Sequence, residues 1–249
     1  MPAALPDALH HLPVWRGREL AQAPEKTLAT GHAGLDAQLP GGGWPLGCLV
    51  EVLQASPQQH VWSLLAPALV RCAEEQAAPM VLVNAPFEPF GPGLQGQGVR
   101  LEQLLCVRAD KVSARLWATE QALRCADVAA VLAWLPQARS EELRRLHLCA
   151  QQHERFLVVF RGMEASAHSS PARLRLAVAG TETLEVSILK RRGPPLLQPL
   201  ALPAQPRRLA ALLESRKSRR PAPQPAARPV PVALTGGSHV LDRTASLAE

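Results

Sequence analysis

Four short apolar runs, separated by segments with helical spacing, constrain the fold of this chain more than any other feature. The runs are Met80–Val83, Leu104–Val107, Val128–Leu135 and Phe156–Phe160. Continuous apolar runs of this length are typical of parallel strands that are covered on both faces. The segments between them repeat apolar residues every three or four positions, as amphipathic helices do. This alternation predicts an α/β fold with a mostly parallel sheet and helices on both faces.

Further elements are expected on both sides of these runs. We predict a strand over Cys48–Leu53 and a helix from His60 to Gln76. Apolar and polar residues alternate over 173–180 and 181–189, which predicts an antiparallel hairpin at one edge of the sheet. Gly41–Gly43 precede a strand, whereas a phosphate cradle must follow one, so we interpret them as a tight backbone corner without a ligand.

The length of 249 residues and the 47% apolar content are enough for one sizeable core with appendages. We predict three parts: an N-terminal helical segment over 1–27, a core over 28–203, and a tail over 204–249. The first part has Leu5, Leu9, Leu12 and Trp15 at helical spacing. It packs either on its own core or on a neighbouring subunit, and the sequence leaves both open.

The positive charge of the chain is concentrated near its C-terminus. The tail has eight Arg or Lys residues against three acidic ones, which is +5 of the net charge of +6, and it is rich in proline. We predict that it is disordered. Two compact basic clusters are candidates for weak, electrostatic contact with DNA phosphates, although for the tail we favour docking on a partner protein over DNA contact. They consist of Lys190, Arg191 and Arg192, and of Arg216, Lys217, Arg219 and Arg220.

Several classes of site and location are disfavoured by the sequence. It has no apolar stretch long enough to span a membrane and no secretory signal pattern, so we expect a cytoplasmic protein. The five cysteines have no C-x-x-C spacing, and we expect them to be reduced residues of the core or of helix faces. The spacing of His10, His11, His147 and His153 is not that of a metal site, so we expect no metal and interpret these residues as solvated.

The stretch EVLQASPQQHVWSLL, over Glu51–Leu65, has the layout of a phosphate-binding loop, with a strand, a turn and a helix. In the G-x-x-x-x-G-K-[ST] pattern, glycines admit the phosphate, lysine neutralises it and a hydroxyl holds magnesium. Those positions fall here on Gln54, Gln59, His60 and Val61. All the groups that would bind the nucleotide are therefore replaced.

Several segments in order resemble the core of the RecA recombinase, over roughly Leu28 to Leu200. They are TGHAGLDAQLPGGGWPLGCLVEV, LLCVRAD, TEQALRCADVAAVLAW and FLVVF. Within that superfamily the chain is similar to the ImuA family, whose members occur with an inactive Y-family polymerase homologue and an error-prone polymerase in damage-induced mutagenesis cassettes. The most specific part of the resemblance is the run L-D-x-x-L-P-G-G-G-W-P-x-G.

The resemblance implies a RecA-like fold with further losses at the nucleotide site. The carboxylate that polarises the attacking water would fall near Asn84 to Pro86, and the magnesium-orienting aspartate near Leu132. We therefore expect no ATP hydrolysis, no bound cofactor and no small-molecule substrate. The segment 161–175 matches a DNA-contacting loop, where Arg161, Arg173 and Arg175 could touch phosphate, or is simply the lead-in to the hairpin.

Our leading hypothesis from the sequence is a non-catalytic accessory protein of damage-induced (SOS) translesion DNA synthesis. The resemblance implies that its partners are proteins of the translesion polymerase assembly, with the RecA filament as a further possibility. The alternative is a SulA-like inhibitor of cell division that binds the tubulin-like division protein, because that group also resembles a RecA core without the ATPase.

Overall fold

The structure is a computed structural model, and it describes residues 26–56, 61–180, 183–196 and 198–203. The chain divides into two compact units, 1–209 and 210–249, and every described residue belongs to the first. The expected N-terminal helix up to residue 25 and the expected disordered tail lie outside the described residues. The division into three parts therefore remains a prediction.

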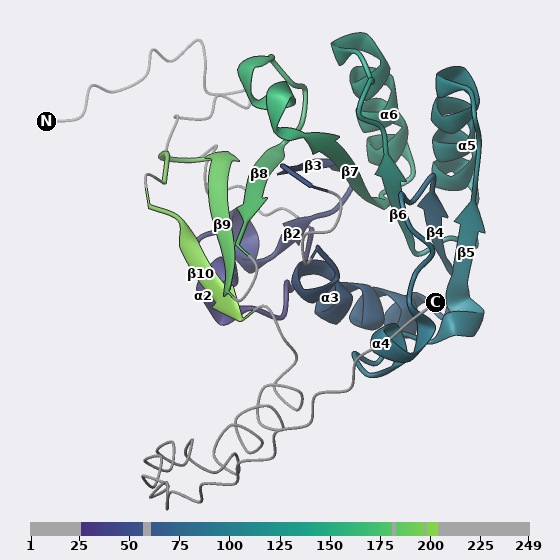
Figure 1. Cartoon of the computed structure of the whole chain (residues 1–249), viewed down its shortest axis with the longest axis horizontal. Helices are drawn as coiled ribbons and strands as arrows, with labels where there is room; N and C mark the ends of the chain where they lie inside the picture. Colours follow the sequence, from purple (N-terminus) through teal and green to yellow (C-terminus); the bar gives the residue numbers. More distant parts are fainter. Residues whose placement is uncertain (1–25, 57–60, 181–182, 197, 204–249) are drawn as a thin grey trace, which may run out of the picture. The chain divides into compact units, whose positions relative to one another are not determined.

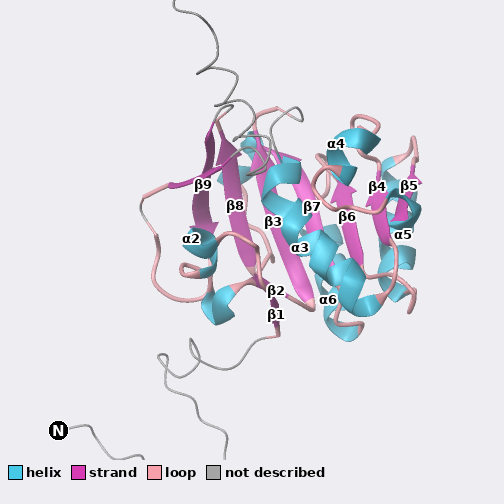
Figure 2. Cartoon of the chain, turned by 90° about the horizontal axis from the view of Figure 1, so that it is seen from below, coloured by secondary structure: helices cyan, strands magenta, loops and turns pink. Residues whose placement is uncertain are grey.

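One sheet of eight strands is the framework of the described part, in the order β10-β9-β8-β3-β7-β6-β4-β5. All neighbouring pairs from β8 to β5 are parallel, whereas β9 runs antiparallel to β8 and β10 antiparallel to β9. Figure 2 shows β9 and β8 towards one edge and β5 at the other. The strands are β3 (Cys48–Gln54), β4 (Met80–Val83), β5 (Leu104–Val107), β6 (Ala130–Trp134), β7 (Phe156–Gly162), β8 (Leu174–Ala179), β9 (Thr183–Lys190) and β10 (Leu200–Pro203).

Helices cover both faces of the sheet, as expected, and Figure 1 shows α5 and α6 side by side across the sheet from α3. None of the helices in the described part is long and apolar enough to cross a membrane. The α-helices are α2 (Ala33–Asp36), α3 (Val61–Gln76), α4 (Gly91–Gln95), α5 (Val112–Arg124) and α6 (Ser140–Gln152), and the 3-10 helices are η2 (Pro40–Gly42), η3 (Leu101–Gln103) and η4 (Met163–Ala167).

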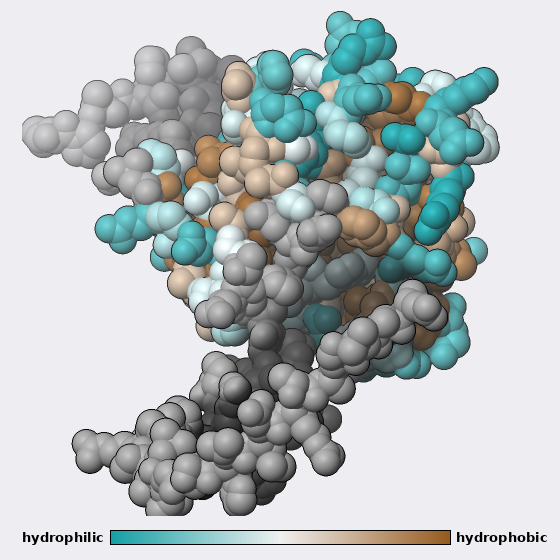
Figure 3. Space-filling model, viewed as in Figure 1, coloured by the Kyte–Doolittle hydropathy of each residue, from teal (hydrophilic) through white to brown (hydrophobic). Residues whose placement is uncertain are grey.

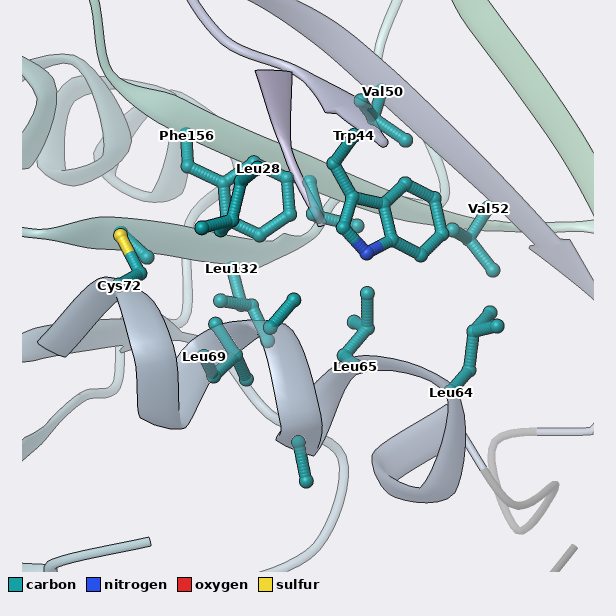
Figure 4. Close-up of a cluster of buried hydrophobic side chains, with 14 of the residues drawn as sticks. Leu28, Trp44, Val50, Val52, Leu64, Leu65, Leu69, Cys72, Leu132 and Phe156 are labelled. Carbon is teal, nitrogen blue, oxygen red and sulfur yellow. The ribbon is translucent and has the colours of Figure 1, made fainter. Parts of the chain in front are cut away.

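The first hydrophobic cluster lies between α3 and the sheet (Figure 4). Leu64, Leu65, Leu69 and Cys72 recur at helical spacing on α3, and all four are buried. Successive side chains of a strand point to opposite faces of the sheet. Alternate residues of the strands, such as Val52 of β3, therefore face these helix residues in the same cluster. The period of three and four in the sequence therefore correctly identified the buried side of α3.

The second cluster lies on the opposite face, beneath α5 and α6. Leu116 and Leu123 of α5 and Leu143 and Leu146 of α6 pack there against the strand residues of odd number, such as Val159. Both faces of the central strands are thus covered, which explains why these strands read as unbroken apolar runs.

The expected fold class is confirmed, and the structure adds three short strands. β10 follows Pro199 and ends on Pro203, which hid it in the sequence, but an edge strand tolerates proline because its outer N–H groups are unpaired. Its Leu202 is buried. β1 (Thr27–Leu28) and β2 (Trp44–Pro45) form a separate antiparallel pair.

The glycine corner before β3 is confirmed. Gly41 and Gly42 have φ angles of 76° and 74°, a region that favours glycine, and they lead into Trp44. At Gly43 a Cβ atom would lie 2.4 Å from the carbonyl oxygen of Leu28, so no larger residue fits against β1. The glycines therefore serve the close approach of two backbone segments.

Candidate functional site

The degenerate phosphate-loop positions begin at the carboxyl end of β3. Gln54 is the last residue of that strand and is 6% exposed, and its Oε1 has no hydrogen-bond partner. Gln59 and His60 lie outside the described residues, and Val61 begins α3. The structure thus places a buried side chain where the pattern requires the first glycine.

A cavity of about 270 Å³ opens at the carboxyl ends of β3, β4, β6 and β7. Open parallel sheets typically bind ligands at the carboxyl ends of their strands. Trp134 and Phe160 form part of its wall, and their rings stack with centroids 4.4 Å apart and planes at 21°. Leu132, where we expected the magnesium-binding position, is a buried residue of the α3 cluster, so the side chain at the strand's carboxyl end is Trp134.

The acidic groups near this cavity do not reproduce those of an ATPase. Asn84 and Pro86 line it at the end of β4, and Asn84 has a φ of 57° with its N–H donating to the Val107 carbonyl at 2.7 Å. Among the described residues that line the cavity, Glu164 contributes the one carboxylate. It follows β7 in the chain, so it does not occupy either of the two acidic positions that the resemblance implies.

Titration of the purified protein with Mg-ATP is expected to give no saturable heat, corresponding to a Kd weaker than about 1 mM. The expectation rests on Gln54, Gln59, His60 and Val61, which supply neither the lysine charge nor the hydroxyl ligand of the phosphate pattern. Isothermal titration calorimetry is the measurement, with an active RecA-type ATPase titrated in parallel as a control. A saturable isotherm that disappears when magnesium is chelated would contradict the prediction.

A buried ion triad occupies the sheet face beside this cavity. Glu51 is fully buried in β3, with one oxygen 2.9 Å from Nη1 of Arg161 in β7 and the other 2.5 Å from Nε of Arg175 in β8. Glu51 points to the same face as Leu49 of the α5 and α6 cluster, because the two are two residues apart on one strand. Three neighbouring parallel strands are thereby tied together.

The two arginines of the triad also hold the adjoining loops. Arg161 donates from Nη2 to the Ala138 carbonyl at 3.0 Å, before α6. Arg175 donates to the carbonyls of Ala165 at 2.8 Å and His168 at 3.1 Å, in and after η4. The hydrogen bonds of Arg161 and Arg175 are therefore made largely within the protein, which favours the alternative that this segment is the lead-in to the hairpin.

A signal for the triad was present in the sequence. Glu51 is the one charged residue within the run CLVEVLQ, and a carboxylate in a strand that is buried on both faces requires a cationic partner. Arg161 and Arg175 each lie in a neighbouring apolar strand. Sequence reasoning missed the pairing because the strand order and register were needed to bring the three residues together.

The first predicted basic cluster lies at the end of β9. Lys190 is exposed and donates from Nζ to the Ser170 carbonyl at 2.9 Å. Partial burial, and then the Arg175 guanidinium, lower the pKa of Lys190. Arg191 donates to the carbonyls of Pro194 and Gln38, so it fastens the hairpin to the segment after α2. Arg192 is half-buried.

The second predicted cluster, Arg216, Lys217, Arg219 and Arg220, lies outside the described residues. The structure instead adds Arg173 to the hairpin cluster. Arg173 is exposed at the start of β8 and lines a crevice together with Arg191 and Arg192. DNA contact by these residues remains a prediction.

A second cavity, of about 320 Å³, lies at the opposite ends of the strands, beside the amino terminus of β3. His147 of α6 lines it and is half-buried, and its Nδ1 accepts a hydrogen bond from the Leu49 N–H at 3.1 Å. Burial lowers the pKa of His147, and the cations Arg173, Lys190 and Arg144 lower it further. The interpretation of His147 as an ordinary solvated histidine is wrong, because β3 holds its ring.

The remaining metal and cysteine expectations have mixed outcomes. Within the described ranges, no group of three or more His, Cys, Asp and Glu side chains could hold a metal ion. Three cysteines, Cys48, Cys72 and Cys149, are buried, and burial raises the pKa of Cys72 to about 11. Cys106 and Cys125 are exposed, so the expectation of core or helix-face positions is wrong for Cys106, which lies on the edge strand β5.

These features define an α/β protein with a mostly parallel sheet whose phosphate-loop positions lack the nucleotide-binding residues. The chain is homologous to the cell division inhibitor SulA of Edwardsiella piscicida, with 33% identity over 107 residues, or 43% of this chain and 64% of that protein. The match thus covers less than two thirds of that relative. No protein-family model matches the chain.

A solved structure was also found to be similar. The crystal structure of SulA from Pseudomonas aeruginosa shares 27% identity with this chain, at a TM-score of 0.39. The alignment covers 45% of this chain and 97% of that one.

Proposed function

We propose that the protein is a non-catalytic accessory factor of damage-induced (SOS) translesion DNA synthesis, acting through contacts with other proteins. Its partners in this proposal are an inactive Y-family polymerase homologue and an error-prone polymerase, with the RecA filament as a further partner. The observation that carries the proposal is an intact, mostly parallel sheet in which Gln54 and Trp134, at the carboxyl ends of β3 and β6, stand in place of binding and catalytic groups.

The homology to SulA supports a protein-binding role linked to the DNA-damage response. The resemblance to the ImuA family supports the specific role in mutagenesis, because it extends over roughly 28–200, well beyond the 107 residues matched by SulA. The protein would work in the cytoplasm, where its proposed partners act.

Exposed apolar side chains offer surface for such contacts. Leu105 on β5, Trp117 on α5, and Phe87 and Phe90 between β4 and α4 are between 48% and 73% exposed. Figure 3 shows apolar groups among the polar residues on one face of the molecule. Large exposed apolar residues are typical of protein-binding surfaces when they gather into patches.

A second function is favoured by one observation, the 33% identity to a cell division inhibitor. In this alternative the protein blocks division after DNA damage by binding the tubulin-like division protein. The two functions make opposite predictions for a strain that lacks the gene.

The deciding experiment measures ultraviolet-induced mutation frequency and cell length in the same cultures of a deletion strain. Loss of induced mutations with normal filamentation is the expected result, and the native gene supplied on a plasmid should restore mutagenesis. Unchanged mutagenesis with lost filamentation would establish the division inhibitor instead. Normal values of both would reject both functions.

A further inference from the structure

We propose that the edge strand β5 pairs antiparallel with β5 of a second copy of this chain, so that the two sheets become continuous. This self-association is independent of the proposed role in mutagenesis, because its test uses the purified protein. β5 ends the strand order, and among the described strands it pairs with β4 alone. An edge strand of this kind presents unpaired backbone groups to any strand that fits it.

The outward-facing backbone groups of β5 belong to Leu104 and Cys106. The Asn84 N–H donates to the Val107 carbonyl at 2.7 Å, so the polar groups of Val107 point towards β4. Neighbouring residues of a strand direct these groups to opposite sides, so those of Cys106 and the Leu104 carbonyl point away from β4. The Leu104 N–H is already donated within η3. Two antiparallel copies of β5 can therefore join through two hydrogen bonds, each from a Cys106 N–H to the Leu104 carbonyl of the partner.

The same strand exposes apolar side chains on one face of the sheet. Leu105 is 48% exposed and Val107 is 36% exposed. Leu105 lies beside Val81 of the second cluster and so points to the face that carries α5 and α6. α5 packs on β4 and β6, which leaves these two side chains of β5 accessible. Pairing with a second copy would place Leu105 against Leu105 of the partner and remove apolar surface from water.

The charges that flank β5 fit a second copy of the same segment. Arg100 and Glu102 precede the strand, Arg108 and Asp110 follow it, and all four side chains are exposed. When Leu105 lies opposite Leu105 of the partner, Glu102 of one copy comes beside Arg108 of the other, and Arg100 comes beside Asp110. Each contact occurs twice, because a twofold axis makes it mutual. The edge is thus electrostatically complementary to itself, which is why we assign it to a second copy.

Other registers of the two strands are disfavoured. A shift by one residue would bring outward-facing backbone groups against groups that point towards β4, and it would exchange the two faces of the sheet. A shift by two residues in one direction places Arg100 beside Arg108. The same shift in the other direction places Glu102 beside Asp110. Like charges meet in both cases, so the charges favour the register centred on Leu105.

The first test measures self-association of the full-length protein by sedimentation velocity over a range of concentrations. The native protein is expected to reach twice the mass of one chain. R108E should weaken the dimer about tenfold, because two repulsive contacts replace two attractive ones. The double variant E102R/R108E exchanges the charges and should restore the dimer.

The matched control is R144E, which reverses an exposed cation of α6 and changes the net charge by the same amount as R108E. It should dimerise like the native protein. All the replaced side chains are exposed, so the variants should fold, which circular dichroism checks. A dimer that R108E leaves unchanged would overturn the proposal. A native protein that stays monomeric would also overturn it and would leave the edge to a strand of another protein.

The second test checks the register by cross-linking, with copper phenanthroline as the oxidant. In the proposed register Leu105 lies opposite its own copy, at a distance that a disulfide can span. L105C/C106S should therefore form a covalent dimer, whereas C106S, which retains the exposed Cys125, should not. No cross-link in L105C/C106S, or a stronger one through Cys106 of the native protein, would overturn the proposed pairing.

Discussion

Replacement of Glu51 by alanine is expected to lower the free energy of unfolding by about 3–5 kcal/mol. The carboxylate is fully buried and is paired with both Arg161 and Arg175. Its removal would leave two buried guanidinium groups without a counter-charge, and burying an unpaired charge is costly. Urea denaturation followed by circular dichroism measures the effect.

The matched control is Glu154→Ala, which removes a carboxylate from an exposed ion pair with Lys26. Exposed pairs typically contribute no more than about 1 kcal/mol, so this variant should remain close to the native protein. A triple replacement of Glu51, Arg161 and Arg175 by leucine should recover part of the loss, because no buried charge remains. Equal stability of Glu51→Ala and Glu154→Ala would contradict the assignment of the triad as a buried charge network.

The second large effect is expected for Trp44→Ala, at about 3–5 kcal/mol of unfolding free energy. Trp44 is fully buried, and its ring lies 6.2 Å from that of Phe156 between centroids. Figure 4 shows it between β3 and α3, close to Val52 and Leu65. The expected cost comes from the large cavity that alanine would leave, since the Nε1 group has no hydrogen-bond partner to lose.

Trp117→Ala provides the control, because this tryptophan of α5 is 63% exposed. It should change the free energy of unfolding by less than about 0.5 kcal/mol. If Trp44→Ala were as stable as Trp117→Ala, the packing of β2 against the first cluster would have to be rejected. Trp117→Ala also removes exposed apolar surface, so its effect on partner binding can be measured in a stable protein.

Local periodicity was sufficient to predict most elements of the sheet. The strands Met80–Val83 and Leu104–Val107 have the expected bounds, and the helix expected over 60–76 is α3. These elements were readable because burial on both faces leaves an unbroken apolar run, and burial on one side leaves a period near 3.6. β10 was missed because Pro199 precedes it and Pro203 ends it, and edge pairing does not depend on a local pattern.

The candidate site was less predictable than the fold. Lys190, Arg191 and Arg192 were identified as a cluster because they are adjacent in the chain. The sequence did not predict their different roles, because Arg191 donates to the carbonyl of Gln38, which is 153 residues away in the chain. The contribution of Arg173 likewise depends on where β8 begins relative to β9.

The amino-acid sequence by itself determined the α/β class, the succession of strands and helices, and the absence of phosphate-binding residues at Gln54, Gln59, His60 and Val61. Only the tertiary structure decided that Arg161 and Arg175 both pair with Glu51 in the interior, whereas Lys190 donates to the Ser170 carbonyl at the surface. The physical reason is that periodicity records whether a residue is buried, whereas the partner of a buried charge is set by the order and register of strands more than one hundred residues apart.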